Sequence, residues 1–564
     1  MSPRPNLAPP PPTAATPARS ARRGRRAATV LVALCALLLT DVAAQLPGAG
    51  PLPTTPDAEA LTLTTHDTAP HDSTDAGGRE STQASKGSGG AAAKARDTRP
   101  NIVLITSDDQ TDTELAWMPK TRKLLGKAGI NFTDGINPHP LCCPARAEIL
   151  TGEYAQNNGV RHNKGRYGGY AAFMRHNADE HIGVWLRRAG YHTAFIGKTM
   201  NGYDRPSTNA RRMPGWDYWS ATRRGTYAFY GTEFTNNGSP KTYQDTYVAD
   251  VVRNQTNERV KQWSKTKKPF FIWASHVGPH DAIRAGRWGP PVPARRHAKM
   301  FSDTKIPTRK KPSFREKDRS DKPAEVRRVE RKPDMVWKFR ERIRSLQAID
   351  EANASLIKTL RRTGQLDNTI IVYVSDNGFQ LGEHDLLTKN FPYEESLQIP
   401  FLMRGPGIGS NGNRSRQTAS IVDLAPTFLD AAGVLARVRK DGHTDGESLL
   451  PVAAKKRTLN DTTLIQAGPA TRKQTKVGWM WRGVRTSRYT YVLWWNGFEE
   501  LYDRREDPYQ MDNLSGAKGK LRDGAYRGVR DELSSRLKSL RNCKGLEQCE
   551  RQEFGAEPQP SGNS

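Results

Sequence analysis

Cysteine is scarce in this sequence, with five residues among 564. Cys35 lies in an N-terminal apolar run, which leaves four for the rest of the chain. Cys543 and Cys549 enclose Lys-Gly-Leu-Glu-Gln, and this spacing predicts a small disulfide loop of the kind formed in oxidising compartments. Cys142 and Cys143 are adjacent, and a disulfide between them would be strained. Cysteine usage therefore fits an exported protein.

The sequence also lacks a hydrophobic run long enough to predict a membrane span. The apolar segment from Ala27 to Leu39 is shorter than a bilayer requires. Basic residues precede it and Val42-Ala43-Ala44 follows, which is typical of a secretory signal. Paired arginines in its basic part leave a twin-arginine export route open. We expect cleavage near Ala44 and a secreted mature protein without a stable membrane span.

Large apolar residues are nearly absent from residues 45–99, which consist mostly of Pro, Thr, Ser, Gly, Ala and Asp. Such a segment cannot bury enough apolar surface to offset the entropy cost of ordering. We therefore predict a disordered linker between the signal segment (1–44) and an ordered region that begins at Pro100. A short disordered tail is expected at 553–564.

Acidic residues are outnumbered, with 59 Asp and Glu against 87 Lys and Arg, a net charge of +28. This balance favours anionic partners, although a genome rich in Arg codons would give the same composition. Residues 295–344 are especially basic. They are interpreted as a solvated surface loop or as a positive rim that attracts a polyanionic substrate. No nucleic-acid-binding module is recognisable, so nucleic acid is not an expected partner.

Four short apolar, β-branched runs predict strands buried on both faces: 101–106, 193–196, 270–274 and 369–374. Helical patterns lie between them, at 181–190 and 335–360. This alternation predicts an α/β fold, in which helices sandwich a large, mostly parallel sheet over residues 100–455. Aromatic-rich runs follow at 478–485, 489–495 and 500–503. They predict a smaller antiparallel-sheet subdomain over residues 456–552.

Polar side chains follow the first and the last of these predicted strands. Asp108 and Asp109 come directly after the first, and Asp376 and Asn377 after the last. Because ligands bind beyond the carboxyl ends of parallel strands, we expect these side chains at one site. Adjacent carboxylates and an amide oxygen suit a hard cation, and several protein oxygens favour calcium over magnesium. Alone, the first pair would fit a solvated loop and the second an Asn-Gly turn.

The run from Leu141 to Arg146 contains Cys-x-Pro-x-Arg. It resembles the motif in which type I sulfatases present a cysteine for oxidation to formylglycine. Other motifs occur in the order seen in sulfatases of the alkaline phosphatase superfamily: Asp108-Asp109, Gly197-Lys198, Pro279-His280, Asp376-Asn377-Gly378 and Lys389. The chain from Pro100 to about Leu514 therefore resembles this family. Among its members, it is most similar to the N-acetylglucosamine-6-sulfatases.

The resemblance implies a metal site. Calcium would be bound by Asp108, Asp109, Asp376 and Asn377, with the oxidised Cys142 touching the ion. It also implies a partner during biosynthesis, the formylglycine-generating enzyme. The alternative for the cysteine itself is an unmodified, buried structural residue.

The resemblance also implies the catalytic groups. Arg146 would hold the hydrated aldehyde derived from Cys142, and Lys198 and Lys389 would bind the sulfate oxygens. His280 would lie near the leaving oxygen, where it or Lys389 would protonate the departing alcohol. Each residue also has an ordinary structural interpretation, as a surface lysine or a loop histidine. As an ordered set they favour the catalytic one.

Two positions depart from the family pattern. Many sulfatases have a histidine two residues after the lysine that matches Lys198, where this chain has Met200. Asn201 is a candidate to supply the missing contact. The serine usual before the arginine of the motif is Ala145 here, a residue that the motif tolerates. His276 is interpreted as a core or loop residue, and His384 is assigned no role.

The predicted activity is the hydrolysis of a sulfate ester. The expected substrate is a sulfated sugar such as N-acetylglucosamine 6-sulfate, or an aryl sulfate. The same scaffold and nucleophile would also suit a phosphodiesterase or phosphonate monoester hydrolase. A further alternative is a non-catalytic, basic glycan-binding protein in which Cys142 is never oxidised.

Overall fold

The computed structural model describes residues 97–561, apart from 206–207, 209, 329–334, 410–411, 457, 459–461, 516–520, 550–553 and 555. The predicted signal segment and nearly all of the predicted linker lie outside these residues. All the described residues belong to one unit, Ala91–Ser564. Within the described ranges, no helix is both long and apolar enough to cross a bilayer.

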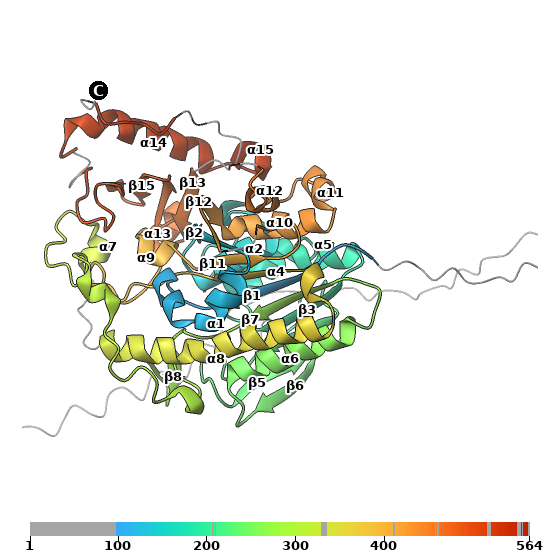
Figure 1. The fold of residues 1–564 in the computed structure, drawn as a ribbon. Helices are drawn as coiled ribbons and strands as arrows, with labels where there is room; N and C mark the ends of the chain where they lie inside the picture. Colours follow the sequence, from blue (N-terminus) through green and yellow to red (C-terminus); the bar gives the residue numbers. More distant parts are fainter. Residues whose placement is uncertain are drawn as a thin grey trace, which may run out of the picture. The chain divides into compact units, whose positions relative to one another are not determined.

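A ten-stranded sheet runs through the centre of this unit (Figure 1). Its strand order is β12-β2-β11-β10-β1-β7-β3-β4-β5-β6. The strands are β1 (Asn101–Ser107), β2 (Ile130–Ile136), β3 (His192–Gly197), β4 (Tyr218–Thr222), β5 (Thr232–Asn236), β6 (Ser239–Tyr243), β7 (Phe270–Ser275), β10 (Thr369–Ser375), β11 (Phe401–Arg404) and β12 (Asn413–Ser420). The four predicted strands are β1, β3, β7 and β10, which lie side by side and pair in parallel. Antiparallel pairing is confined to β10–β11, β11–β2, β4–β5 and β5–β6 among the pairs of this sheet.

Helices cover both faces of the sheet, as predicted. They are α1 (Pro119–Thr121), α2 (Cys142–Thr151), α3 (Ala155–Asn158), α4 (Gly169–Asn177), α5 (Ile182–Arg188), α6 (Val248–Trp263), α7 (Ala324–Arg327), α8 (Met335–Arg362), α9 (Glu394–Leu397), α10 (Leu424–Ala431), α11 (Leu435–Lys440) and α12 (Leu450–Ala453). Successive side chains of β1 point to opposite faces. Ile102 and Leu104 join the core beneath α2, α5 and α10, whereas Val103 and Ile105 join the core beneath α6 and α8 (Figure 1).

The C-terminal region forms a second, antiparallel sheet. Its strands are β13 (Thr463–Ala467), β14 (Trp481–Arg485), β15 (Tyr489–Trp494) and β16 (Glu499–Asp503), in that order. The predicted meander is β14–β16, and β13 extends it by one strand. Helix α13 (Arg472–Val477) connects β13 to β14, and α14 (Arg527–Leu540) packs on this sheet through Val529 and Leu533. The predicted disulfide between Cys543 and Cys549 is present, in α15 (Gly545–Cys549) and the residues before it.

The described residues of the predicted tail contact this subdomain. Gln559 accepts a 2.7 Å hydrogen bond from Arg488 Nη1, and the amide of Ser561 donates to the carbonyl of Ala525 over 2.9 Å. These contacts hold residues close to the C-terminus against β15 and the start of α14.

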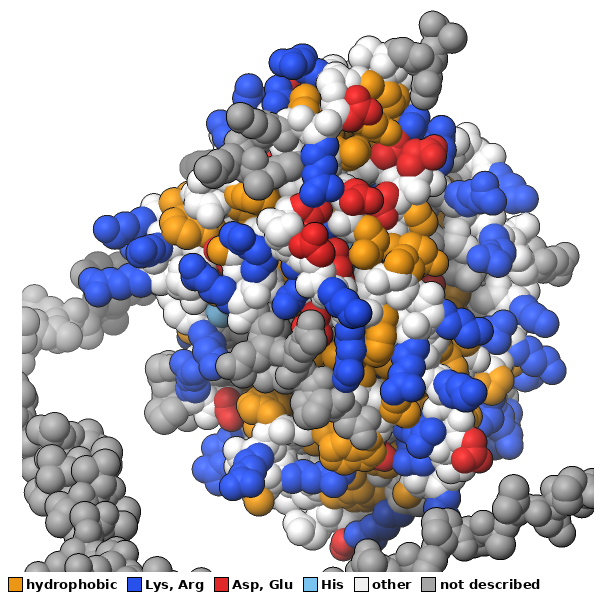
Figure 2. All heavy atoms as spheres, turned by 90° about the vertical axis from the view of Figure 1, so that its left-hand side faces the viewer, with side chains coloured by type: hydrophobic (Ala, Val, Ile, Leu, Met, Phe, Trp, Pro, Cys, Tyr) orange, Lys and Arg blue, Asp and Glu red, His pale blue; other side chains and the backbone are white. Residues whose placement is uncertain are grey.

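Basic side chains dominate the surface in Figure 2, where the fewer acidic side chains gather mainly in one group. In the segment 295–344, however, many of the basic side chains are paired with carboxylates. Lys311 Nζ lies 3.0 Å from Glu383 and 2.7 Å from Glu395, and Lys338 Nζ lies 2.6 Å from Asp281. This segment therefore uses much of its charge to attach a long surface excursion to the sheet.

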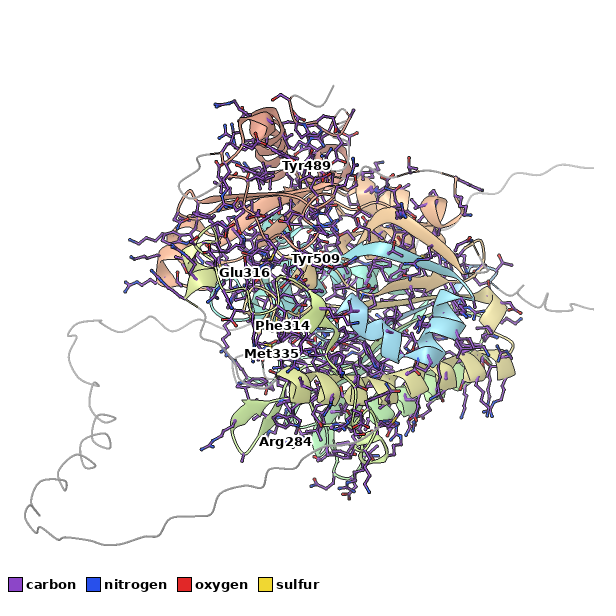
Figure 3. The ribbon with its side chains drawn as sticks, turned by 60° about the vertical axis from the view of Figure 1, so that its left-hand side comes forward. Arg284, Phe314, Glu316, Met335, Tyr489 and Tyr509 are labelled. Carbon is purple, nitrogen blue, oxygen red and sulfur yellow. A yellow bond between two sulfur atoms is a disulfide. The ribbon has the colours of Figure 1, made fainter. Side chains whose placement is uncertain are left out.

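A small hairpin projects beside the carboxyl end of the sheet. It consists of β8 (Ala282–Arg284) and β9 (Arg287–Gly289). Figure 3 shows Arg284 on this hairpin, well separated from Tyr509. The hairpin follows directly after Pro279 and His280, so its position is fixed close to the residues predicted to act on the substrate.

Candidate active site

The predicted metal ligands meet at one edge of the sheet. Strands β1 and β10 pair in parallel with Ser107 opposite Ser375, so the residues that follow them emerge together. The amide of Asp109 donates to Asp376 Oδ1 over 3.1 Å, and Asn377 Nδ2 donates to Asp109 Oδ1 over 2.7 Å. All these side chains are buried. The arrangement gathers three carboxylates, including that of Asp108, in a small volume.

Cys142 is the first residue of α2 and is 1% exposed. Its Sγ lies 3.6 Å from Asp108 Oδ1, 4.0 Å from Asp109 Oδ1 and 3.1 Å from Lys389 Nζ. Burial, reinforced by Asp108, raises the pKa of the thiol well above its ordinary value. The unmodified side chain is therefore a neutral thiol, which is a poor nucleophile. The same position places it at a helix N-terminus, where anions are favoured.

Arg146 lies one turn along α2 and binds several groups of the site. Its Nε is 3.0 Å from Asp376 Oδ2, and its Nη2 is 3.4 Å from Asp108 Oδ2. Its Nη1 donates to the carbonyl of Lys198 over 2.6 Å and to Ser275 Oγ over 2.7 Å. Burial disfavours the charged guanidinium, but Asp376 and Asp108 raise its pKa above the ordinary value. It is a fixed cation that links α2 to the ends of β3, β7 and β10.

Two lysines complete the charge balance. Lys198 Nζ pairs with Asp108, and Lys389 Nζ pairs with Asp109. Although burial lowers the pKa of each ammonium, these carboxylates raise both pKa values above the ordinary range. With Arg146, the site holds three cations against three carboxylates. Lys198 also lines the cleft described below.

His280 also adjoins this cluster. Its Nε2 is 3.7 Å from Asp109 Oδ2, and its Nδ1 is 2.8 Å from the carbonyl of Asp281. The ring stacks on Tyr227 with centroids 4.5 Å apart. Burial lowers the pKa of His280 to about 3, so the imidazole is neutral near pH 7. In the tautomer that fits this contact, Nδ1 carries the proton and donates to the carbonyl, so the Nε2 that faces the site is unprotonated.

The other histidines singled out from the sequence lie elsewhere. His276 is buried in the sheet, and burial lowers its pKa to about 3. His384 is fully buried, with Nδ1 2.7 Å from Glu316 Oε2 and its ring against Tyr393. It does not line the cleft described below.

The two departures from the family pattern have distinct environments. Met200 is buried in the hydrophobic core. Asn201 contacts Cys143, the residue after Cys142, because its backbone amide donates to Cys143 Sγ over 3.2 Å and its Oδ1 lies 3.3 Å from the same sulfur. Asn201 also lines the cleft beside Lys198. That cleft has a volume of about 470 Å³, and Lys164, Arg223 and Tyr227 contribute to its walls.

A metal ion fits the donor set. Oxygen or sulfur atoms of Asp108, Asp109 and Cys142 and a ring nitrogen of His280 all lie within 4.8 Å of one another. Asn377 Oδ1 is buried and accepts no hydrogen bond from the described residues. A buried amide oxygen without a donor is costly, and a cation would satisfy it. Carboxylate and amide oxygens are the ligands that Ca²⁺ and Mg²⁺ prefer.

Three supporting residues were not singled out from the sequence. Tyr227 stacks on His280, and Lys198 Nζ lies 5.0 Å from its ring centroid. Ser275 accepts from Arg146. Arg342 of α8 donates to the carbonyl of Asp109 and pairs with Glu114 at 2.6 Å. The sequence could have indicated a buried role for Arg342, because it is a charged residue beside the apolar stripe of a predicted helix. Tyr227 lies in an irregular segment, where no sequence pattern indicates its position.

We expect Arg342→Met to lower the free energy of unfolding by about 3 kcal/mol, since it leaves the buried carboxylate of Glu114 without its partner. Urea denaturation of the purified variant measures the change. The double variant Glu114→Gln/Arg342→Met removes both charges and should recover most of the loss. An unchanged midpoint in the single variant would contradict a structural role for the pair.

Comparisons with known proteins identify the family to which the chain belongs. Residues 100–434 match the family model described as Sulfatase, which is more than half of the chain. The chain belongs to the sulfatase family. A second model, the C-terminal region of N-sulphoglucosamine sulphohydrolase, matches residues 382–543 of this sulfatase. The family, the enzyme class and the fold predicted from the sequence are thereby confirmed.

Individual sulfatases show how far the similarity extends. A Caenorhabditis elegans extracellular sulfatase Sulf-1 homologue is 34% identical over 397 residues, which cover 66% of this chain and 53% of that protein. The sulfatase described here thus spans about half the length of that relative. The goat (Capra hircus) N-acetylglucosamine-6-sulfatase is 28% identical over 500 residues, with 81% and 86% covered. A solved structure in complex with its substrate D-glucosamine-2-N,6-O-disulfate has a TM-score of 0.63 at 23% identity, covering 82% of this chain and 100% of that one.

Proposed function

We propose that this sulfatase hydrolyses sulfate esters of sugars, with a formylglycine made from Cys142 as its nucleophile and calcium as its metal. The observation that carries the proposal is the position of Cys142. It is buried at the start of α2, between three carboxylates and two lysines, and burial keeps its thiol neutral. Such a thiol has little value as a nucleophile, whereas an oxidised derivative at the same place would be surrounded by the groups it needs.

The two groups supply distinct chemistry. Oxidation of Cys142 by a formylglycine-generating enzyme would supply a hydrated aldehyde, whose hydroxyl is a nucleophile that no unmodified side chain offers. Calcium, held by Asp108, Asp109, Asp376 and Asn377, would lower the pKa of that hydroxyl and offset charge on the sulfate. A basic, secreted protein with its signal cleaved near Ala44 would meet sulfated glycans outside the cell.

The chain's own residues bind and orient the ester. Arg146, fixed by Asp376 and Ser275, holds the nucleophile in place from one helical turn away. Lys198 and Lys389 bind the non-bridging sulfate oxygens, where charge persists through the reaction. Lys389, whose ammonium stays protonated, gives a proton to the departing alcohol oxygen, and the neutral imidazole of His280 lies beside that oxygen with Nε2 facing the site. The aromatic face of Tyr227 holds the His280 ring in its orientation.

A sugar is the favoured alcohol because an exposed aromatic surface adjoins these residues. Trp288 of β9 is 58% exposed, and its ring lies 5.2 Å from Tyr227 and 5.7 Å from His280. Ile283, also exposed, lines the cleft with Lys198. Apolar faces of sugar rings stack on such surfaces. The names of the goat relative and of the substrate-bound structure point to glucosamine sulfates.

Trp288→Ala should raise KM for N-acetylglucosamine 6-sulfate about tenfold, the equivalent of about 1.4 kcal/mol of stacking. The value of kcat should change little, because Trp288 lies outside the reacting groups. Tyr509→Ala is the matched control, since Tyr509 is an exposed aromatic in a separate cleft of about 370 Å³. Steady-state kinetics on both variants test this, and an equal effect of the two substitutions would argue against a sugar platform at Trp288.

The proposed function is tested by two measurements on protein secreted from its native host. The first is the mass of the tryptic peptide that contains Cys142, which should carry an aldehyde. The second is a side-by-side assay of sulfate, phosphodiester and phosphonate monoester hydrolysis, in which sulfate release should be fastest. An intact thiol in active protein would overturn the formylglycine mechanism. Faster phosphonate or phosphodiester cleavage would favour the alternative hydrolase, and glycan binding without turnover would favour a binding protein.

A further inference from the structure

Two arginines share one indole ring beside the active site. The guanidinium carbons of Arg161 and Arg482 each lie 4.5 Å from the ring centroid of Trp479. Arg161 comes from the loop after α3, and Arg482 from β14 of the C-terminal sheet. Stacking on an aromatic face fixes the orientation of a guanidinium but leaves its N–H groups, which lie in the plane of the guanidinium itself, free to bind.

These arginines have no counter-charge among the residues that the structure describes. Neither forms an ion pair there, and three of their nitrogens, Nε of Arg161 and both Nε and Nη2 of Arg482, are buried without a hydrogen-bond acceptor. Burial, with repulsion from Arg161 and Arg541, lowers the pKa of Arg482 to about 9. By contrast, Arg146, Arg342 and the other buried arginine of β14, Arg485, all pair with carboxylates.

An uncompensated pair of desolvated cations is costly. The cost is offset if an anion binds to their N–H groups, since these groups match the oxygens of a sulfate or carboxylate. As whole residues both side chains are only partly buried, so part of each is open to solvent. The arrangement therefore has the composition of an anion site, in which Trp479 orients both guanidiniums.

The cluster adjoins the nucleophile through two short connections. Two residues after Arg161, Asn163 Oδ1 accepts a 2.9 Å hydrogen bond from the amide of Cys143. On the other side, Trp481 of β14 donates from Nε1 to the carbonyl of Asn390 over 3.1 Å, next to Lys389. The cluster is thus placed at the border of the active site, but none of its residues contacts Cys142, Arg146 or the carboxylates among the described residues.

We propose that Arg161 and Arg482, stacked on Trp479, form a second anion-binding site for a sulfate or carboxylate that the substrate carries on a sugar other than the one being desulfated. This rests on the proposed function and narrows its substrate class to multiply charged glycans. Free sulfate, the product, has the same chemistry and is the other source of an anion. Arg161 and Arg482 are positioning residues in this scheme, since they bind remote charge and do not touch the ester.

The first test compares two disaccharides that differ only in an additional sulfate on the second sugar. For the doubly sulfated compound, Arg161→Gln and Arg482→Gln should each lower kcat/KM by about 10- to 100-fold, mainly through KM, as expected for loss of a charge-assisted hydrogen bond. For the singly sulfated compound, both variants should stay within about twofold of the wild type. Arg437→Gln, which removes an exposed arginine of α11, is the charge-matched control and should change neither value. Equal losses on both compounds, or no loss on either, would overturn the proposal.

A binding measurement separates this proposal from the proposed function. In Cys142→Ala protein, which should not turn over, calorimetry should show tighter binding of the doubly sulfated compound, and Arg482→Gln should abolish that preference. If the wild type hydrolysed no sulfate ester but Cys142→Ala protein still showed this binding preference, the anion site would be supported and the proposed catalytic function would be wrong. Inorganic sulfate could instead protect the wild type, but not Arg482→Gln, against thermal unfolding, while the protein shows no preference between the disaccharides. That result would assign the site to free sulfate and overturn the proposal that it binds an anion of the substrate.

Discussion

Replacing Cys142 by serine should lower the rate of sulfate release by at least about 10⁴-fold, the scale on which loss of a catalytic nucleophile acts. A serine hydroxyl at the start of α2 could accept the sulfuryl group once. It could not then release it, because it has no second hydroxyl whose deprotonation expels sulfate. Rapid-quench measurement should therefore show at most one equivalent of alcohol per enzyme, with no free sulfate following it.

Cys143→Ala is the matched control for this experiment. Cys143 is equally buried, but its sulfur contacts Asn201 and not the carboxylates. This variant should keep turnover within about tenfold of the wild type. If Cys142→Ser turned over continuously, or if Cys143→Ala lost as much activity, the assignment of the nucleophile to Cys142 would be wrong.

Removal of divalent metal should be the second large effect, lowering kcat by about 10³-fold. This corresponds to about 4 kcal/mol of stabilisation by a bound cation, a typical contribution for Lewis-acid assistance. Dialysis against a calcium chelator, followed by metal analysis and kinetics, measures it. Added Ca²⁺ should restore activity more fully than Mg²⁺, because four protein side chains leave little room for the waters that Mg²⁺ retains.

Asn377→Ala provides the corresponding variant. Asn377 Oδ1 is the buried oxygen without a described donor, so its loss should raise the calcium concentration needed for half-maximal activity. At saturating calcium, most of the activity should return. Full activity in protein that metal analysis shows to be free of divalent cations would eliminate calcium from the mechanism.

The sequence predicted the centre of the fold better than its margins. Strands β1, β3, β7 and β10 are buried on both faces, and such strands require continuous apolar runs that are visible without a structure. The outer strand β12, Asn413–Ser420, is polar and one of its faces is solvated, so it carries no such run. The helix α14 was missed although Val529, Leu533 and Leu537 share one of its faces.

The candidate site divides in the same way. Asp108, Asp109, Asp376 and Asn377 could be placed together because each follows a predicted central strand. Groups that arrive from irregular segments could not. The cluster of Arg161 and Arg482 depends on the docking of β14 against a loop more than three hundred residues earlier in the chain. Nothing in either local sequence encodes that proximity.

The burial of Cys142 has a consequence for how active molecules arise in the cell. Once α2 has packed, a modifying enzyme has no access to a side chain that is 1% exposed. If Cys142 is oxidised as proposed, the oxidation must take place in the interval between synthesis of the chain and the folding step that buries this side chain. Export of an already folded chain would close the interval in the cytoplasm, whereas threading an unfolded chain would carry it across the membrane. The specific activity of a secreted batch would then be fixed by the relative rates of Cys142 oxidation and folding in the newly made chain. No later treatment of the folded protein could raise it.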